Sequence, residues 1–466
     1  MKVGTKVSSQ GIDLTKGSIL RKLIAIAAPI MGMQIFQMGY NLIDMFFLGR
    51  ISADAVAAAG SAGMFLWLSA AFVLFGQLGA EIGVSQSVGK GDPLTARKYG
   101  KKAILIALIW GVIIGLIAII FSHPLISLLQ IREVQVAHDA AIYLRIVGFS
   151  LPMFFVNNAI SGIYNGVGNS KLPFYLKTIG LIFNIIITPI FIFALGWGII
   201  GAAIATTIGH TVTGLLLLFS VKHPRLCPFD DFQFKEIFAI DEGIVQQIFK
   251  WSLPVAANSA LFTLFTMIIA RFVAEFGSGA IAAQRVGTQI EALTWLVGGG
   301  YAAAFRAFVG QNYGAKQFDR LKKGYAISSI VMSSWGFGVG LLMFFAAGPI
   351  FRLFITDPAI VTMGVSYMRI LAIVQVAQCM DGVSASAFDG LGKTLPPTIV
   401  STTFNALRVF VAFFLSQTTL GIDGIWIGIA FGNLMRGVVL TTWYLLYSRF
   451  TFKKGSDRNE NYCSAS

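Results

Sequence analysis

The chain carries isolated polar and ionisable side chains inside long apolar segments, and these are the residues whose chemistry stands out. In the first half, Asp44 lies in the segment "YNLIDMFFLG". A carboxylate at bilayer depth costs about 2.5 kcal/mol or more, so its presence predicts a partner, a water-filled cavity or an ion that visits it. Asp44, with the side-chain oxygens of Asn41, Asn184, Thr188 and Thr206, is the candidate site for a coupling cation. The alternative is that Asp44 is an interfacial residue near the outer end of the first helix. Glu81, near the inner end of its segment, is expected to be solvated.

The second half is more highly charged. Its apolar segments contain or adjoin Arg285, Glu291, Arg306, Asp381, Asp389, Arg408 and Arg436. A buried carboxylate attracts cations or holds a proton, whereas an arginine beside it turns the same group into a structural ion pair. Both interpretations stay open for these residues. The candidate residues for binding substrate or cation are Glu291, Asp381, Asp389, Arg285 and, from the first half, Asn157.

The elements that must position these residues are membrane-spanning helices. The composition is 56% hydrophobic and only 12% charged, which is too apolar for a soluble globule of this length. A bilayer needs about 20 apolar residues per helix, and runs such as "AILIALIWGVIIGLIAII" are apolar on every face, as a lipid-embedded helix is and a barrel strand is not. We predict an all-α integral membrane protein with twelve spans, at 23–49, 57–83, 102–122, 141–165, 174–195, 198–221, 252–276, 281–308, 325–348, 365–389, 398–417 and 422–447.

The two halves of the chain are faint copies of each other. Residues 143–173 recur at 367–397, so that Tyr143, Gly168 and Pro173 return as Tyr367, Gly392 and Pro397, while Asn157 and Asn165 are replaced by Asp381 and Asp389. We predict two six-helix lobes, related by a pseudo-two-fold axis along the membrane normal. Their expected boundaries are 1–221 for the N-terminal lobe, 222–251 for a cytoplasmic linker, 252–448 for the C-terminal lobe and 449–466 for a polar tail.

The distribution of basic residues predicts the orientation of the chain. The net charge is +14, and with a cytoplasmic amino terminus the inner segments hold 25 Lys and Arg against six in the outer loops. This bias places both termini in the cytoplasm of a multi-pass inner (plasma) membrane protein, and it assigns the basic residues to anionic lipids and not to nucleic acid. Three cysteines in different surroundings predict no disulfide.

Several motifs, taken in order, resemble the multidrug and toxic compound extrusion (MATE) family. They are the spacing from Pro29 through Asp44 to Gly49, the loops "VGKGD" and "VGQNYGAKQFDR", the helix "AAQRVGTQIEAL", and the paired "YNGVGNSKLP" and "FDGLGKTLP". The resemblance covers nearly the whole chain.

The resemblance implies roles for particular residues. Asp44 matches the first-helix aspartate implied in proton or sodium coupling, and Asn184 and Thr206 match the oxygens that accompany it. Thr188 stands where some members have a second aspartate, which disfavours a sodium site built from several carboxylates. Asp381 matches a tenth-helix acid associated with cation or substrate binding, and Glu291 matches less closely. The seventh-helix acid of some members is absent from 260–269.

These observations predict an antiporter that exports amphipathic, often cationic, organic compounds by alternating access of the two lobes, driven by protons in preference to sodium. The expected partners are small-molecule substrates and membrane lipids, and the chain is expected to act as a monomer without a cofactor or metal ion. The first alternative is a flippase for lipids or lipid-linked oligosaccharides, which would need Arg285, Arg306, Arg408 and Arg436 unpaired in one cavity. The second is a membrane enzyme, but the four histidines are scattered and no nucleophile or phosphate-loop motif is present. We therefore predict that the protein is not an enzyme and has no catalytic residue.

Overall fold

The fold was obtained as a computed structural model, which describes residues 11–131, 133–230, 232, 236–237 and 241–463, the side chains of Asn41 and of residues 453–463 excepted. The chain divides into two compact units. Residues Ala25–Ala256 form the N-terminal unit together with the segment that ends at Leu14, and Thr15–Ile24 join the chain from Ala257 onward in the C-terminal unit.

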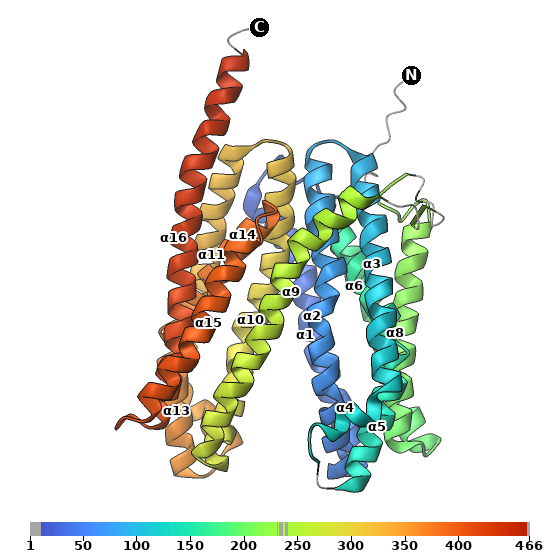
Figure 1. Ribbon diagram of the computed structural model, residues 1–466, viewed down its shortest axis with the longest axis vertical. Helices are drawn as coiled ribbons and strands as arrows, with labels where there is room; N and C mark the ends of the chain where they lie inside the picture. Colours follow the sequence, from blue (N-terminus) through green and yellow to red (C-terminus); the bar gives the residue numbers. More distant parts are fainter. Residues whose placement is uncertain (1–10, 132, 231, 233–235, 238–240, 464–466) are drawn as a thin grey trace. The chain divides into compact units, whose positions relative to one another are not determined.

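The N-terminal unit is a bundle of helices that lie side by side (Figure 1). Its core forms where α2 packs against α3, α5 and α6, through small and aliphatic side chains such as Ala58, Ala107 and Val147. The elements are α1 (Ile19–Gly49), α2 (Ala53–Gly89), α3 (Pro93–Ile120), α4 (Ser122–Ser127), α5 (Val134–Gly148), α6 (Leu151–Gly166), α7 (Lys171–Pro189), the π-helical turn η1 (Ile190–Ala194) and α8 (Gly198–Lys222).

The C-terminal unit repeats this plan. Its strongest packing is of α16 on α15 and α14, and of α14 on α11 and α10. The elements are α9 (Glu242–Glu275), α10 (Ser278–Gly314), α11 (Phe318–Phe345), α12 (Ala347–Phe354), α13 (Pro358–Ala372), α14 (Gln375–Gly390), α15 (Leu395–Ser416) and α16 (Ile422–Cys463). Within its unit, α16 projects beyond the other helices at its C-terminal end (Figure 1), so residues 449–463 continue the last helix.

The internal repeat extends to the helix ends. Helices α10 and α11 begin and end 225 positions after α2 and α3, and α13 and α14 begin and end 224 positions after α5 and α6. Helix α6 and its counterpart α14 are followed by the same turn. Gly168 and Gly392 have φ values of +84° and +73°, and this left-handed conformation favours glycine at both positions.

Membrane-length helices confirm the predicted fold class. Ten helices in the described ranges are long and apolar enough to span a bilayer, and two further spans are bent pairs, which gives the predicted twelve. The pairs α5–α6 and α13–α14 bend by 51° and 49°, so the predicted single helices over 141–165 and 365–389 are each two helices. Pro152 in the first turn of α6 explains the first bend. The second bend has no proline at the equivalent position, which Val376 occupies, and nothing in the sequence explains it.

Side chains that cap the helices fix where several of them begin. Asp92 accepts hydrogen bonds from the backbone nitrogen of Thr95 at 3.0 Å and from its hydroxyl at 2.6 Å, and Pro93 follows in the first turn of α3. These hydrogen bonds hold the pKa of the Asp92 carboxyl below its usual value. Asp357 caps α13 in the same way, through the backbone nitrogen of Ala359 at 2.9 Å.

Candidate functional site

A polar cluster surrounds Asp44 inside the N-terminal unit. Tyr40 lies one turn before Asp44 on α1, and its hydroxyl is 3.0 Å from the hydroxyl of Thr206 on α8. The Tyr40 hydroxyl also interacts with the side chain of Asn184 on α7. Asp44 is partly buried, and its Oδ1 atom has no hydrogen-bond partner among the described residues. A buried carboxylate oxygen without a hydrogen-bond partner is suited to hold a proton or a cation.

Helices α7 and α8 supply the neutral oxygens of this cluster. Thr188 donates to the backbone carbonyl of Asn184 at 2.9 Å and lies 3.2 Å from its Oδ1 atom. Asn184, Thr188 and Thr206 are all buried. A Cβ atom on Gly209 would lie 3.0 Å from the Cβ of Asn184, so glycine here lets α8 approach α7 closely enough to bring the three oxygens together.

The structure joins four of the five predicted coupling residues. Asp44, Asn184, Thr188 and Thr206 lie in one cluster, while the side chain of Asn41 falls outside the described part of the chain. Tyr40 and Tyr143 complete the cluster, since the Tyr143 hydroxyl interacts with the Thr206 side chain and with the charge of Asp44. Sequence reasoning missed Tyr40, although its position one turn before Asp44 places it on the same helix face.

Four other polar residues of the N-terminal unit lie nearby on α6, α7 and α8. The amide of Asn157 donates to the backbone carbonyl of His210 at 3.2 Å, and His210 is one turn from Thr206 on α8. Lys177, two turns before Asn184 on α7, donates to Asn158 Oδ1 at 3.3 Å. The Lys177 amine is therefore directed to a neighbouring helix of the same unit.

Glu81 is the one acid of this unit whose predicted surroundings are wrong. Its side chain is 0% exposed, whereas a solvated helix end was expected. The helix does not stop near Glu81, because α2 continues to Gly89, and this length keeps the carboxylate inside the packed helices.

In the C-terminal unit, Glu291 on α10 is held by neutral donors. The hydroxyl of Tyr367 on α13 donates to Glu291 Oε2 at 3.2 Å. With its amide nitrogen facing Glu291, Gln378 donates to Oε1 at 3.2 Å and accepts from Trp295 Nε1 at 2.9 Å. A Cβ atom on Gly287 would lie 2.3 Å from the Tyr367 ring, so this glycine makes room for the contact.

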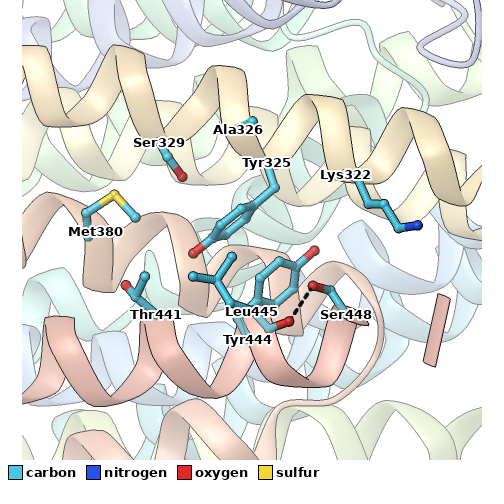
Figure 2. Close-up of a pocket in the computed structure, with 9 residues that line it drawn as sticks. All are labelled: Lys322, Tyr325, Ala326, Ser329, Met380, Thr441, Tyr444, Leu445 and Ser448. Atoms are coloured by element: carbon cyan, nitrogen blue, oxygen red, sulfur yellow. Dashed lines mark hydrogen bonds between the residues drawn. The ribbon is translucent and has the colours of Figure 1, made fainter. Parts of the chain in front are cut away.

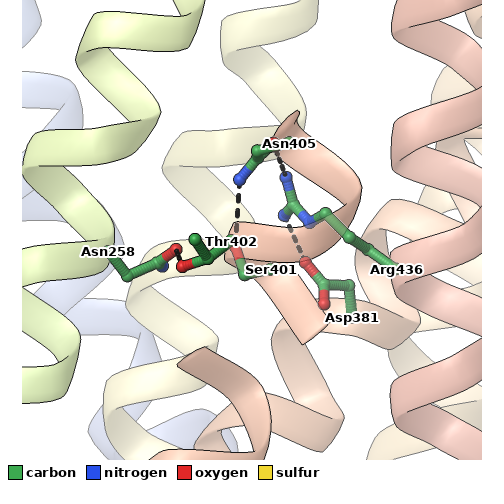
Figure 3. Close-up of polar contacts among 6 residues, drawn as sticks. All are labelled: Asn258, Asp381, Ser401, Thr402, Asn405 and Arg436. Atoms are coloured by element: carbon green, nitrogen blue, oxygen red, sulfur yellow. Dashed lines mark hydrogen bonds and ion pairs between the residues drawn. The ribbon is translucent and has the colours of Figure 1, made fainter. Parts of the chain in front are cut away.

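Asp381 on α14 belongs to a polar network and not to an open site. It forms an ion pair with Arg436 on α16, and Arg436 also donates to Asn405 Oδ1 at 3.3 Å. Asn405 in turn donates to the hydroxyl of Ser401 at 3.1 Å, and nearby Thr402 donates to Asn258 at 3.1 Å (Figure 3). The charge of Asp381 is therefore balanced within its own unit.

The remaining charged candidates also differ in their surroundings. Asp389 pairs with Arg306, whose Nε atom is 3.4 Å from Oδ2. Arg408 donates to Thr266 at 2.9 Å and lies over the Phe262 ring, 4.9 Å from its centre. Arg285 has an exposed side chain on α10 and is not part of these contacts. Of the four arginines that a flippase would use together, two face carboxylates.

In the described ranges, no three His, Cys, Asp or Glu side chains are close enough together to hold a metal ion. A cavity does open in the C-terminal unit, between α11, α14 and α16 (Figure 2), and none of the charged candidates above lines it.

Comparisons with known proteins identify the family. The MatE family model matches residues 29–190 and 254–414, once in each half of the chain. A probable multidrug resistance protein NorM of Thermotoga maritima is 25% identical over 92% of either chain. The probable multidrug resistance protein YoeA of Bacillus subtilis is 27% identical over 89% of this chain and 91% of its own. The crystal structure of a MATE protein in the bent conformation shares the fold, with a TM-score of 0.90 and 23% identity over 97% of this chain and 100% of that chain. The chain therefore belongs to the MATE family of multi-pass membrane transporters.

Proposed function

We propose that this MATE transporter exports amphipathic organic compounds, cationic ones in preference, in exchange for protons that Asp44 carries. The observation that supports this most directly is the Asp44 cluster. It puts one carboxylate, with an oxygen that no described residue satisfies, among the neutral oxygens of Tyr40, Asn184 and Thr206. A proton needs a single basic oxygen, and a site of this kind provides one.

Sodium is the less favoured coupling ion. Hard metal cations bind sites with several oxygen ligands and favour more than one negative charge. Thr188 lies in the cluster where a second carboxylate would strengthen such a site, and its hydroxyl is engaged with Asn184. Asp44 is then the one formal negative charge that the cluster offers.

Coupling requires that proton and substrate stabilise different states of the transporter. If protonated Asp44 favours one orientation of the two units and bound substrate favours the other, the two fluxes are linked by differential binding alone. In the C-terminal unit, we assign substrate contact to Glu291, whose charge is less directly balanced than those of Asp381 and Asp389. We further propose that the protein acts as a monomer in the inner membrane, with both termini in the cytoplasm.

Everted membrane vesicles test this proposal. Uptake of ethidium or norfloxacin is measured at a fixed pH gradient, with and without sodium, for the natural protein and for Asp44→Asn. We expect proton-driven uptake that does not need sodium and that the substitution abolishes. Uptake that requires a sodium gradient, or that survives Asp44→Asn, contradicts the assignment of Asp44 as the proton carrier.

A further inference from the structure

The cavity of the C-terminal unit has a volume of about 360 Å³, within the range of about 300–1,000 Å³ that is usual for small-molecule sites. It is separate from the charged network of the same unit, because none of Glu291, Asp381, Asp389 and Arg436 lines it. Figure 2 shows its walls, which α11, α14 and α16 provide through nine residues, among them Lys322, Tyr325, Ser329, Thr441 and Tyr444.

The internal repeat identifies the equivalent place in the N-terminal unit, between α3, α6 and α8. The offset of α11 from α3 pairs Ser329 with Ile104, and the glycines Gly201, Gly209 and Gly214 of α8, which recur as Gly424, Gly432 and Gly437 of α16, pair Thr441 with Leu218. Ile104 belongs to one hydrophobic cluster with the linker residues Phe229 and Phe232, and Leu218 packs against that cluster. In that unit the groove is therefore filled by aromatic rings from the chain itself.

Contacts of the linker confirm that it is docked in this groove. The Phe229 ring lies 3.7 Å from the position of a Cβ atom on Gly100, which is the counterpart of Tyr325. Arg97, the counterpart of Lys322, donates to the backbone carbonyl of Asp230 at 3.2 Å. The hydroxyl of Tyr164 on α6 donates to the Leu226 carbonyl at 3.2 Å. The groove of the N-terminal unit is thus filled by the rings of Phe229 and Phe232 and by the Asp230 carbonyl oxygen, which lies near Arg97.

No described segment plays this part in the C-terminal unit. The chain after Ser448 continues as helix α16 to Cys463, and Phe452 stacks on Phe318 with ring centres 5.3 Å apart. The cavity therefore keeps the walls of the groove without its aromatic filling.

The walls present specific chemistry to a ligand. The rings of Tyr325 and Tyr444 stack with centres 4.2 Å apart and form an aromatic surface. Tyr444 is 1% exposed, and its hydroxyl has no hydrogen-bond partner in the described part of the chain, although a buried hydroxyl without a partner is costly. Lys322 is the one charged residue among the nine that line the cavity. Its ion pair with Asp319, at 3.7 Å, is largely exposed to solvent, and such an exposed ion pair is weak.

We propose that this cavity is a second small-molecule site, which binds an aromatic compound of one or two rings that carries a carboxylate or a similar anionic acceptor. The rings take the place that Phe229 and Phe232 fill in the other unit. The acceptor is attracted by the charge of Lys322. A lipid acyl chain is a poorer occupant, because it offers Lys322 no negative charge.

Calorimetric titration of the full chain in nanodiscs of neutral phosphatidylcholine, with empty nanodiscs subtracted, tests the proposal. The probes are 2-naphthoate, 2-naphthamide and 2-naphthylmethylammonium, which share one ring system and differ in charge. We expect affinity to fall in that order. Lys322→Gln should weaken 2-naphthoate binding by about three- to tenfold and leave 2-naphthamide unchanged, while Lys323→Gln, an exposed neighbour that does not line the cavity, changes neither.

A second variant addresses the cavity itself. Ser329→Ile with Thr441→Leu introduces the side chains that the N-terminal unit has at these positions, and it should reduce the binding of all three probes by at least about tenfold. Thermal unfolding of this variant in the same nanodiscs shows whether it is folded.

Three outcomes overturn the proposal. The first is unchanged 2-naphthoate binding in a folded Ser329→Ile/Thr441→Leu variant, and the second is equal binding by the Lys322→Gln and Lys323→Gln proteins. The third is a phospholipid that native mass spectrometry finds on the natural protein, that the filled variant lacks, and that 2-naphthoate does not displace. In that case the occupant is a lipid.

Discussion

Asp381 on α14 and Arg436 on α16 form an ion pair inside the C-terminal unit, 55 positions apart in the sequence. Their side chains are only 11% and 12% exposed. Because both side chains are largely shielded from water, each charge is stabilised mainly by the other. This relationship gives Asp381 a structural role that its position alone does not reveal, and it has consequences for stability.

Removing one partner of this pair should be more harmful than removing both. Asp381→Asn leaves Arg436 buried without its carboxylate, and we expect it to lower the free energy of unfolding by about 3 kcal/mol. The double variant Asp381→Asn/Arg436→Gln should recover part of that loss. Unfolding in detergent is the measurement, and Asp319→Asn, which breaks the exposed pair with Lys322, serves as a control with a change below about 1 kcal/mol. If the double variant is less stable than Asp381→Asn, the loss of Arg436 does not relieve an unpaired buried charge, and the prediction is wrong.

Asp44→Asn should abolish proton-driven export while the protein remains folded. The amide has nearly the same shape as the carboxylate but cannot carry the proton, so substrate counterflow without a pH gradient should persist. Transport in proteoliposomes measures both activities. Asp54→Asn is the matched control, because Asp54 is an exposed acid at the start of α2. Equal loss of counterflow and of driven uptake would mean that Asp44 has a structural or substrate-binding role.

Gly287→Ala should displace Tyr367 from Glu291. The added Cβ atom would lie 2.3 Å from the Tyr367 ring, and relieving such an overlap typically costs about 1–3 kcal/mol. We expect lower thermal stability and a larger loss of transport for cationic substrates than for neutral ones, since the surroundings of Glu291 change.

Gly382→Ala is the control for this substitution, because a Cβ atom there meets nothing within 4 Å. Equal transport losses for charged and neutral substrates in Gly287→Ala would argue against substrate contact by Glu291.

Asp92→Ala should shorten or destabilise the start of α3 in a pH-dependent way. Loss of the cap typically costs about 1 kcal/mol. Because hydrogen bonds from Thr95 lower the pKa of Asp92 in the folded protein, its contribution is present above the unfolded pKa of about 3.9 and is lost as the pH falls through the lower folded value.

The natural protein and Asp92→Ala should therefore differ in unfolding free energy at pH 7 and converge in acid. Gln317→Ala is the symmetry-matched control, since Gln317 holds the equivalent position before α11 and forms no capping hydrogen bond. A difference that stays constant down to pH 3 would show that the cap does not act through the ionised carboxylate.

The sequence by itself determined the fold class, the twelve spans, the repeat and the family. These follow from local composition and from similarity along the chain, because a helix in lipid must be apolar over its whole length and satisfies its hydrogen bonds within itself. The repeat also predicted which residues are equivalent in the two halves, such as Gly168 and Gly392, and the closing turns agree.

Only the tertiary structure decided which polar groups meet. The sequence left open whether Asp381 and Asp389 bind ions or pair with arginines, and the structure pairs them with Arg436 and Arg306. It also added Tyr40 to the Asp44 cluster and Gln378 to Glu291, and it bent two predicted spans. Such pairings depend on how each helix is rotated about its axis and how closely glycines let neighbours approach. Helix rotation and interhelical distance are set by packing between segments that are distant in the chain. The pattern of residues within one segment carries no information about that packing.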